Sequence, residues 1–368
     1  MFYYLYQLFA DYHISGSNLF RYITFRSAMA AVTALAISLF VGPYIIRKLK
    51  EAQIGEEIRH DGPQSHLSKS GTPTRGGLII LASVLIPTVV WADLSNTYIL
   101  LVLLATLWMG IVGFIDDYLK VIKKMKKGLI ARYKTMGQIL LGLVIGSVMV
   151  LSPEFDNIAT VTTIPFVKNL NLDFGYLYIP FVIFVITAMS NAVNLTDGLD
   201  GLAIGVVSIA VTAFAVMCYV TGNVVYSDYL NIIYIQQSSE LTIFCTAMVG
   251  AGLGFLWYNS YPAQVFMGDT GALALGASLG TLAILIKKEL LLPVIGGVFV
   301  AENLSVILQV AYYKYTKKKT GEGKRIFLMA PLHHHYELKG WHETKVVTRF
   351  WIMAILCALL TLTTFKVR

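Results

Sequence analysis

Ten long stretches of this chain carry almost no charged side chains, and this feature restricts the possible folds more than any other. Eight of them run for 17 to 28 residues without Asp, Glu, Lys or Arg, a ninth is interrupted only by Glu302, and a tenth, 350–365, is shorter. A membrane-spanning α-helix needs about 20 mostly apolar residues. The pattern therefore predicts an all-α polytopic membrane protein, in which residues 1–368 form a single integral membrane domain of about ten transmembrane helices. The spans are expected near 26–46, 76–92, 95–115, 135–152, 176–194, 202–222, 241–258, 270–286, 290–313 and 346–365.

The amino-acid composition excludes the two main soluble classes. Apolar residues make up 56% of the chain and charged residues 14%, whereas a soluble domain has about 45–50% and about 25%. Disorder requires low hydrophobicity and a high net charge. The net charge of +8 would suit a nucleic-acid ligand, but the basic residues lie in short loops between apolar stretches, which is typical of membrane topology. We therefore expect the lipid bilayer as a partner and no nucleic-acid partner.

The distribution of basic residues predicts how the chain is oriented. Of the 29 Lys and Arg residues, 22 lie in the three loops 47–75, 116–134 and 314–349. Lys and Arg are enriched in cytoplasmic loops, so these three loops are expected on the cytoplasmic side. Because the number of spans is even, both termini are expected on the other, periplasmic side.

Two adjacent acids end the third span. Asp116 and Asp117 follow 22 uncharged residues, and Lys120 lies within one helical turn of both. An acid near the centre of a membrane helix costs about 2.5–3.5 kcal/mol, so acids at membrane depth suggest a function. Neighbouring residues on a helix diverge by about 100°, so the two carboxylates cannot serve the same ion from one helix face, and we expect them to have divided roles. The alternative is an interfacial acid–base cluster that ends the helix.

A second polar group begins at the end of the fifth span. Asn191, Asn194, Asp197 and Asp200 recur every third residue, and Gly198 follows the first of the two acids. On a helix each such step drifts by about 60°, so three of the four are expected to share one face and to offer oxygen ligands and amide donors. Glycine permits a turn, or a close approach of the backbone to a ligand.

Asp269 is the single acid that separates 28 apolar residues from 17 more. Phe266, three residues earlier, is an aromatic side chain of the kind that stacks on a nucleotide base, and Asn259 lies in the same segment. Like the other acids, Asp269 is expected at a cytoplasmic span end rather than at mid-membrane, which favours a site at the cytoplasmic surface.

Two loops add further polar groups. His333, His334 and His335 are adjacent in the last cytoplasmic loop. Adjacent residues rarely close a tetrahedral zinc site, and no cysteine lies nearby; imidazoles beside a cationic loop are better suited to donating hydrogen bonds to phosphate or moving a proton. The loop 66–77 offers hydroxyls, glycines and cations to a phosphate, but it does not match the P-loop pattern.

Together these groups favour phosphoryl transfer at a membrane surface. Carboxylates and asparagines without histidine or cysteine ligands suit a hard cation such as Mg²⁺, which keeps waters and bridges substrate phosphates. Cationic side chains stabilise the charge of a transferring phosphoryl group. The alternative from another class is a transporter for an anionic solute, but transporters place their binding groups near the midplane, on repeat-related helices, and no repeat is evident here.

Five motifs, in this order, resemble those of the phospho-N-acetylmuramoyl-pentapeptide transferases, a branch of the polyprenyl-phosphate N-acetylhexosamine-1-phosphate transferase superfamily. They are Thr72-Pro-Thr-Arg-Gly-Gly77, Asp116-Asp-x-x-Lys120, Asn194-Leu-Thr-Asp-Gly-Leu-Asp-Gly-Leu202, Phe266-Met-Gly-Asp269 and Pro331-Leu-His-His-His335. The resemblance runs from about His60 to the C-terminus. Arg75 and Ala272 depart from the family pattern, which has Met and Ser there, but neither position supplies an expected ligand.

The resemblance implies a Mg²⁺-dependent enzyme that transfers phospho-N-acetylmuramoyl-pentapeptide from UDP-MurNAc-pentapeptide to undecaprenyl phosphate. The products would be lipid I and UMP, in the first membrane step of peptidoglycan synthesis. It also implies ten helices, a bacterial inner-membrane location with the active site facing the cytoplasm, and a homodimer. The nearest alternative within the superfamily transfers N-acetylglucosamine-1-phosphate from UDP-GlcNAc.

The resemblance further implies roles for single residues. Asp269, with Asp116 and Asp117, would hold Mg²⁺, and Asp116 would either deprotonate the lipid phosphate or act as a nucleophile, with Asp117 assisting. The residues expected to line the diphosphate site are Asn191, Asn194 and Asp197. Those expected to receive the uridine are Leu199, Asp200, Asn259 and Phe266. The other catalytic residues would be Lys120, His333 and His334, and the other substrate-binding residues Lys69, Thr74, Lys134, Gly198, Gln309 and His335.

The ninth span contains residues that disturb helices. Pro293, Gly296 and Gly297 precede Glu302, and proline and glycine can break a membrane helix. We hypothesise a bent span that opens a side groove for the polyprenyl chain. Glu302 is either a functional group of that groove or a structural hydrogen-bond partner.

One loop outside the spans has strand character. Residues 152–175 are rich in Val, Ile, Thr and Phe and contain turn-forming Asn and Pro, which predicts a small β-hairpin.

Overall fold

Helices make up almost all of the regular structure in the computed structural model, which describes residues 2–4, 6, 17–51, 69, 71–121, 128–156, 158–167 and 170–367. Every predicted span coincides with a helix in this part of the chain, so the helical membrane-type architecture is confirmed. The long helices are α2 (Ile23–Glu51), α3 (Gly77–Trp91), α4 (Thr97–Val121), α5 (Ala131–Leu151), α6 (Tyr178–Thr196), α7 (Leu202–Thr221), α9 (Leu241–Asn259), α10 (Gly268–Leu285), α12 (Gly297–Thr320) and α14 (Glu343–Val367). The short elements are α8 (Val224–Leu230), α11 (Leu292–Ile295), α13 (Leu332–Leu338), the strands β1 (Val161–Thr163) and β2 (Asn171–Asp173), and the 3-10 turns η1 (Ser17–Arg21), η3 (Pro153–Phe155), η4 (Gly175–Leu177), η5 (Gln236–Glu240) and η6 (Glu289–Leu291).

The number of spans depends on two of these helices. Within the described residues, eight helices are long and apolar enough to cross a bilayer, and the pair formed by α11 and α12 makes nine if it is counted as one span. Helix α3 has 15 residues, fewer than the about 20 that a perpendicular crossing needs. The count of ten therefore stays a prediction, although α3 lies where the second span was expected.

The main difference from the predicted spans lies at the end of α4. The apolar stretch ends at residue 115, but the helix continues to Val121 and carries Asp116, Asp117 and Lys120 on its last turns. Charged residues end an apolar stretch without ending a helix, because the backbone stays hydrogen-bonded beyond the hydrocarbon layer. The acids are consequently held by a rigid helix rather than by a loop.

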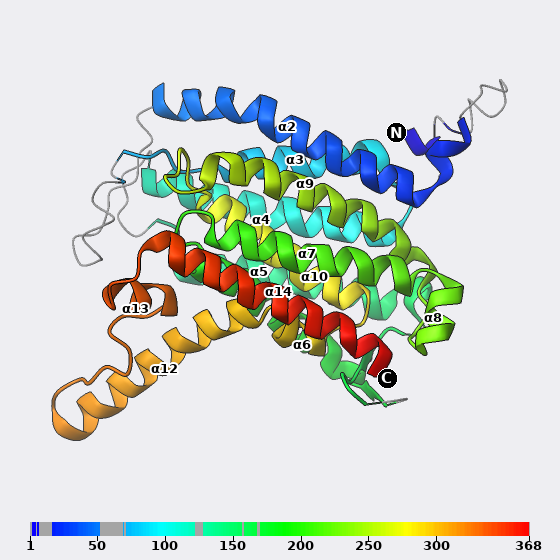
Figure 1. Ribbon diagram of the computed structural model, residues 1–368. Helices are drawn as coiled ribbons and strands as arrows, with labels where there is room; N and C mark the ends of the chain where they lie inside the picture. The colour runs from blue at the N-terminus through cyan, green and yellow to red at the C-terminus, as the bar shows by residue number, and fades with distance from the viewer. Residues whose placement is uncertain are drawn as a thin grey trace.

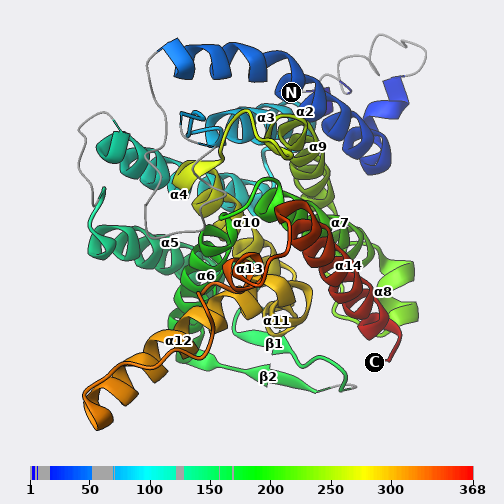
Figure 2. The same ribbon diagram turned by 60° about the vertical axis from the view of Figure 1, so that its left-hand side comes forward.

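Helix α10 forms the centre of the bundle. It packs against α4 and α6, and Figure 2 shows it surrounded by helices. Every residue from Thr270 to Leu285 is buried. The outer helices instead expose large apolar side chains, among them Phe40 (83% exposed) and Trp257 (71% exposed). Apolar residues exposed to this extent on a soluble surface would be unusual, and they fit a bundle surrounded by lipid.

The two chain ends lie at the same end of the bundle. Figure 1 shows the N- and C-terminal labels and α8 at its right-hand end, and α13 and the far end of α12 at its left. Gly198, just after α6, lies against His333 of α13, and Asp269 at the start of α10 contacts the ends of α4 and α6. These three helix ends therefore face α13. The number of crossings and the side of the membrane on which the termini lie stay predictions.

The ninth span is bent, as hypothesised. Helices α11 and α12 meet at an angle of 85° around Gly296. Beyond the bend, α12 leaves the bundle, and both views show its C-terminal half pointing away from the other helices (Figures 1 and 2). The ninth span is therefore not a straight helix in the bundle interior, an arrangement that would have contradicted the hypothesis.

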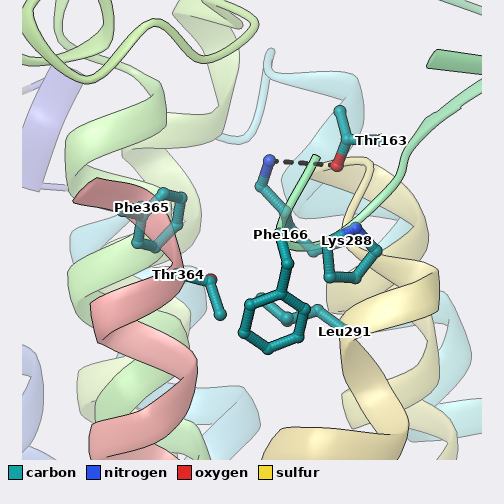
Figure 3. Close-up of a pocket in the computed structure, with 7 residues that line it drawn as sticks. Thr163, Phe166, Lys288, Leu291, Thr364 and Phe365 are labelled. Carbon is teal, nitrogen blue, oxygen red and sulfur yellow. Dashed lines mark hydrogen bonds between the residues drawn. The ribbon is translucent and has the colours of Figure 1, made fainter. Parts of the chain in front are cut away.

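The predicted hairpin is present at the end of the bundle opposite α13. Strands β1 and β2 pair antiparallel, and the hairpin is fixed to η6 by hydrogen bonds from Thr162 to Glu289 and from Thr163 to the Lys287 carbonyl. Figure 3 shows Lys288 donating to Thr163, at 3.2 Å, beside a crevice of about 10 Å³. That is room for about one water molecule, so the crevice is too small for a substrate.

Candidate active site

Three carboxylates from two helices meet where α4 ends and α10 begins. Asp116, Asp117 and Asp269 each offer one oxygen, and these oxygens lie within 4.8 Å of one another. Gly113 makes the approach possible, because a Cβ atom there would lie 2.3 Å from the Asp269 carbonyl oxygen. The two adjacent acids therefore reach one cluster without sharing a face of α4, and their joint binding of an ion stays a prediction. The 100° divergence separates them on the α4 surface, but the N-terminus of α10 lies between them and brings the third carboxylate to both.

Asp117 holds the first turn of α10. Its carboxylate accepts hydrogen bonds from the Asp269 amide (3.2 Å), the Thr270 amide (3.0 Å) and the Thr270 hydroxyl (2.5 Å). Unpaired backbone N–H groups at a helix N-terminus attract negative charge, which explains why an acid occupies this position. Arg75 donates to the Asp117 carbonyl at 2.8 Å and so attaches the 71–77 loop to the same place.

Asp116 and Asp269 share two lysines. Lys120 lies 2.5 Å from Oδ2 of Asp116 and 2.9 Å from Oδ2 of Asp269, and Lys134 lies 2.8 and 2.5 Å from the same two oxygens. The Leu129 amide donates to the other oxygen of Asp116 at 2.6 Å. The partners of the two neighbouring acids thus differ, because Asp117 is bound by a helix end and Asp116 by cations. The division of their roles stays a prediction.

The polar side chains at the end of α6 (Asn191, Asn194, Asp197 and Asp200) contact different parts of the protein. Asn194 donates to Asp269 at 2.8 Å, whereas Asn191 exchanges hydrogen bonds with Gln138 of α5, each at 3.2 Å. Helix α6 ends at Thr196 with Asp197 as its C-cap, so the three-residue pattern does not continue on one face. Asp200 therefore points away from the carboxylate cluster.

Asp200 belongs to a second charged group that the sequence did not reveal. Its carboxylate is 2.7 Å from Lys69 and accepts the Ala263 amide at 3.0 Å. Glu343, the first residue of α14, lies 2.5 Å from Lys69 and accepts the Asp200 amide at 2.8 Å. Glu343 was missed because nothing in its local sequence distinguishes it; only the fold brings it to Asp200.

A cleft of about 300 Å³ adjoins this second group. Its lining residues are Tyr261, Glu337, Gly340, Trp341, His342 and Glu343. The volume is at the lower end of the range for small-molecule sites, about 300–1,000 Å³. Lys69 also lies 6.0 Å from the centre of the Tyr261 ring, so the cleft and the charged group form one polar region.

The three histidines make different contacts. His333 is buried and bonded to Glu302, His334 faces Glu337 at 2.8 Å, and His335 accepts the Leu328 amide at 3.1 Å. Burial lowers the pKa of His335 below its ordinary value, and the charge of Lys339 lowers it further. The structure therefore favours a neutral His335 at pH 7.

Several residues that were predicted to bind substrate form hydrogen bonds within the protein or are buried. The Asn259 amide group donates to the Val265 carbonyl and accepts the Gly201 amide. Gln309 donates to the Phe327 carbonyl and accepts two amides of the same loop. Leu199 is 4% exposed and Thr74 8%. In the described structure these residues support loops, while Phe266 stays partly accessible. Their contacts with substrate stay predictions.

The 71–77 loop is joined to the segment that precedes α10. The Phe266 amide donates to the Pro73 carbonyl at 2.9 Å, and the Gly76 and Gly77 amides donate to the Phe266 and Met267 carbonyls. Arg75, the residue that departs from the family pattern, adopts a positive φ of 77°. Burial lowers the pKa of Arg75, and the charge of Asp117 opposes this.

Comparison with known proteins agrees with this geometry. The family model described as glycosyl transferase family 4 matches residues 99–287. Relatives named phospho-N-acetylmuramoyl-pentapeptide-transferase include those of Chlorobium chlorochromatii (53% identical over 369 residues), Desulforapulum autotrophicum (53% over 368) and Flavobacterium psychrophilum (48% over 409), each alignment covering 100% of both chains. The chain therefore belongs to glycosyl transferase family 4, in the branch formed by the phospho-N-acetylmuramoyl-pentapeptide-transferases.

Proposed function

We propose that this protein transfers phospho-N-acetylmuramoyl-pentapeptide from UDP-MurNAc-pentapeptide to undecaprenyl phosphate, releasing UMP and forming lipid I. The observation that carries the proposal is the cluster of Asp116, Asp117 and Asp269 with two lysines at one end of an apolar helical bundle. Such a site lies where a dissolved nucleotide can meet a lipid headgroup. The names of its full-length relatives support the muramoyl-pentapeptide substrate over N-acetylglucosamine.

The donor atoms of the cluster fit Mg²⁺. Asp116, Asp117 and Asp269 would hold it, because they supply only oxygen ligands and hard cations prefer such ligands. When bound, the ion supplies positive charge against the phosphate oxygens of the nucleotide. Asp117 would contribute while still bonded to the first turn of α10, which keeps the cluster aligned.

The chain's own residues then account for the transfer. Asp116 removes the proton of the lipid phosphate, whose oxygen attacks the phosphorus linked to the sugar. The bond from that phosphorus to the bridging oxygen breaks, and UMP leaves with the electron pair. Lys120 and Lys134 lie beside both Asp116 and Asp269, where they can stabilise the negative charge that spreads over the phosphoryl oxygens.

The two substrates would approach from different directions. The nucleotide sugar would lie along Asn194 and the Asp197–Gly198 turn, with its uridine towards Phe266 and the polar region around Asp200. The polyprenyl chain would lie in the side opening created by the 85° bend before α12. We further propose that the site faces the cytoplasm of a bacterial inner membrane, because most basic residues lie in the loops on that side, and that the protein forms a homodimer.

Purified protein tests the function directly. It should release UMP when incubated with Mg²⁺, undecaprenyl phosphate and UDP-MurNAc-pentapeptide, and release far less with UDP-GlcNAc. Equal or faster release with UDP-GlcNAc would assign the protein to the alternative branch. No release with either sugar would remove the proposed reaction.

Removing divalent cations should stop turnover. With excess EDTA we expect the rate of UMP release to fall by about 10²-fold or more, because the negative charge that develops on the phosphate of the leaving UMP is then opposed by the lysines alone. The measurement is the initial rate before chelation, after it, and after Mg²⁺ is restored. An unchanged rate in EDTA would exclude the metal, and a melting curve of the chelated protein controls for unfolding.

The substitution Gly198→Ala should lower the rate of UMP release without changing the charge of the site. A Cβ atom there would lie 2.3 Å from Nε2 of His333, so the turn or the imidazole must move, and a 1 Å misplacement in an active site can cost about 10²-fold in rate. Gly280→Ala is the matched control, because its nearest neighbour would be 3.4 Å away. Equal activity of the two variants would show that the close approach is not needed.

A further inference from the structure

Glu302 makes two contacts with a single residue of another segment. It lies in α12, five residues after Gly297, and its side chain is fully buried. One carboxylate oxygen accepts the backbone amide of His333 at 3.2 Å, and the other lies 3.1 Å from Nδ1 of the same imidazole. The first residues of α13 are therefore fixed to the bent ninth span.

A carboxylate partner at this contact would assign the hydrogen of a neutral His333 to one ring nitrogen. An ionised carboxylate can only accept hydrogen bonds. Nδ1 must therefore be the donor, and in the neutral imidazole Nε2 is then left with a free lone pair.

Nε2 of His333 points into the proposed substrate region. It is buried and has no hydrogen-bond partner among the described residues, a condition that is rare for native polar atoms and requires an explanation. It lies against Gly198, close enough that a Cβ atom would come within 2.3 Å. Gly198 follows the C-cap of α6, the helix whose Asn194 bonds to Asp269.

We propose that Glu302 is a positioning residue that fixes His333 in the Nδ1–H tautomer, so that Nε2 is offered as an acceptor to the nucleotide sugar. The group it accepts from is an O–H or N–H of that substrate, reached when the Asp197–Gly198 turn shifts to admit it. This inference rests on the proposed function for the identity of the substrate. Glu302 lies in α12, which begins at the bend proposed to admit the polyprenyl chain. One helix therefore both forms the proposed lipid opening and orients His333.

The variant Glu302→Gln tests the tautomer with little change in shape. The glutamine carbonyl can still accept the His333 amide, and its NH₂ group then faces Nδ1 and donates to it. Nδ1 must become the acceptor, which moves the hydrogen to Nε2. We expect kcat for UMP release to fall by about 10–100-fold, the usual effect of changing the residue that orients a functional histidine, while KM for undecaprenyl phosphate stays unchanged.

Nitrogen-15 NMR of the full chain, labelled at histidine, reads the tautomer directly. In the wild type the unprotonated nitrogen of His333 should be Nε2, and in Glu302→Gln it should be Nδ1; the signals are assigned by their loss in His333→Asn. Glu322→Gln, an exposed acid just after α12, is the control and should change neither the spectrum nor kcat. A wild-type spectrum with Nδ1 unprotonated would overturn the proposal, as would full kcat in a Glu302→Gln protein whose tautomer is inverted.

Two further measurements keep the test decisive. If Glu302→Gln does not fold, the wild-type spectrum still decides the tautomer. His333→Asn, whose amide can replace Nδ1 but not Nε2, should then show the same loss of kcat; full activity in that variant would exclude a role for Nε2. Absence of UMP release from the wild type would defeat the proposed function, while the spectrum would still report on Glu302 alone.

Discussion

Substituting Asp269→Asn is expected to lower kcat for UMP release by about 10²–10³-fold or more while the protein remains folded. The amide keeps the shape of the side chain, and its oxygen can still accept from Asn194, which now bonds at 2.8 Å. It loses the charge that Lys120 and Lys134 contact. It also removes one of the three carboxylates proposed to hold Mg²⁺, so the cluster should bind the ion less tightly.

The measurement is the initial rate over a range of Mg²⁺ concentrations, together with a melting curve. Asp228→Asn is the matched control, because Asp228 is an exposed acid in α8, at the opposite end of the bundle. If folded Asp269→Asn protein released UMP at a near-normal rate, Asp269 would have no part in the mechanism.

Substituting Asp116→Asn should produce a loss of similar size for a different reason. Positioned general bases contribute about 10²–10⁴-fold to a rate, and an amide cannot take up the proton of the lipid phosphate. The Leu129 amide can still donate to the new side chain, since it now contacts one Asp116 oxygen at 2.6 Å. We therefore expect a folded protein that binds the nucleotide sugar and does not turn it over.

The same assay without lipid distinguishes the two roles considered for Asp116. If Asp116 acts as a base, the wild type should release no UMP until undecaprenyl phosphate is added. A burst of UMP equal to the amount of enzyme, without lipid, would instead indicate a covalent intermediate. Near-normal turnover by folded Asp116→Asn protein would contradict both roles.

The helices could be predicted because a bilayer leaves few alternatives. A backbone in hydrocarbon must satisfy its own hydrogen bonds, so length and apolarity were enough to find each long helix. The short helices α8 and α13 were not predicted. The ends of the long helices were less predictable. Helix α4 continues six residues past its apolar stretch, to Val121, because charges mark the edge of the hydrocarbon and not the end of hydrogen bonding.

The bend of the ninth span and the hairpin were also predictable. Gly296 and Pro293 are local signals with local effects, and an 85° break occurs at that position. The hairpin of β1 and β2 follows from β-branched residues flanking turn residues. Both features have local sequence signals, which is why sequence was sufficient for both, although the hairpin also bonds to the distant residues Glu289 and Lys287.

The site was only partly predictable. Asp116, Asp117 and Asp269 drew attention because acids are costly in apolar surroundings, and the structure brings them together. Glu343 and Gln138 lie outside the motifs, and only tertiary packing reveals their contacts with Asp200 and Asn191.

Contacts of two amide side chains were also beyond the reach of the sequence. Asn259 and Gln309 were expected to contact substrate, but their side chains are bonded to backbone groups of the loops around the site. A motif identifies residues that matter together. It does not distinguish those that face a ligand from those that shape the loop beside it.

The two lysines within the acidic cluster have a consequence for the order of assembly. Three carboxylates and two ammonium groups leave one excess negative charge. Binding of a divalent ion alone would change the net charge of the cluster to one excess positive charge. Binding of a nucleotide alone would make the net charge more negative. Each partner therefore corrects the imbalance that the other creates, and by thermodynamic reciprocity each should strengthen the other's affinity.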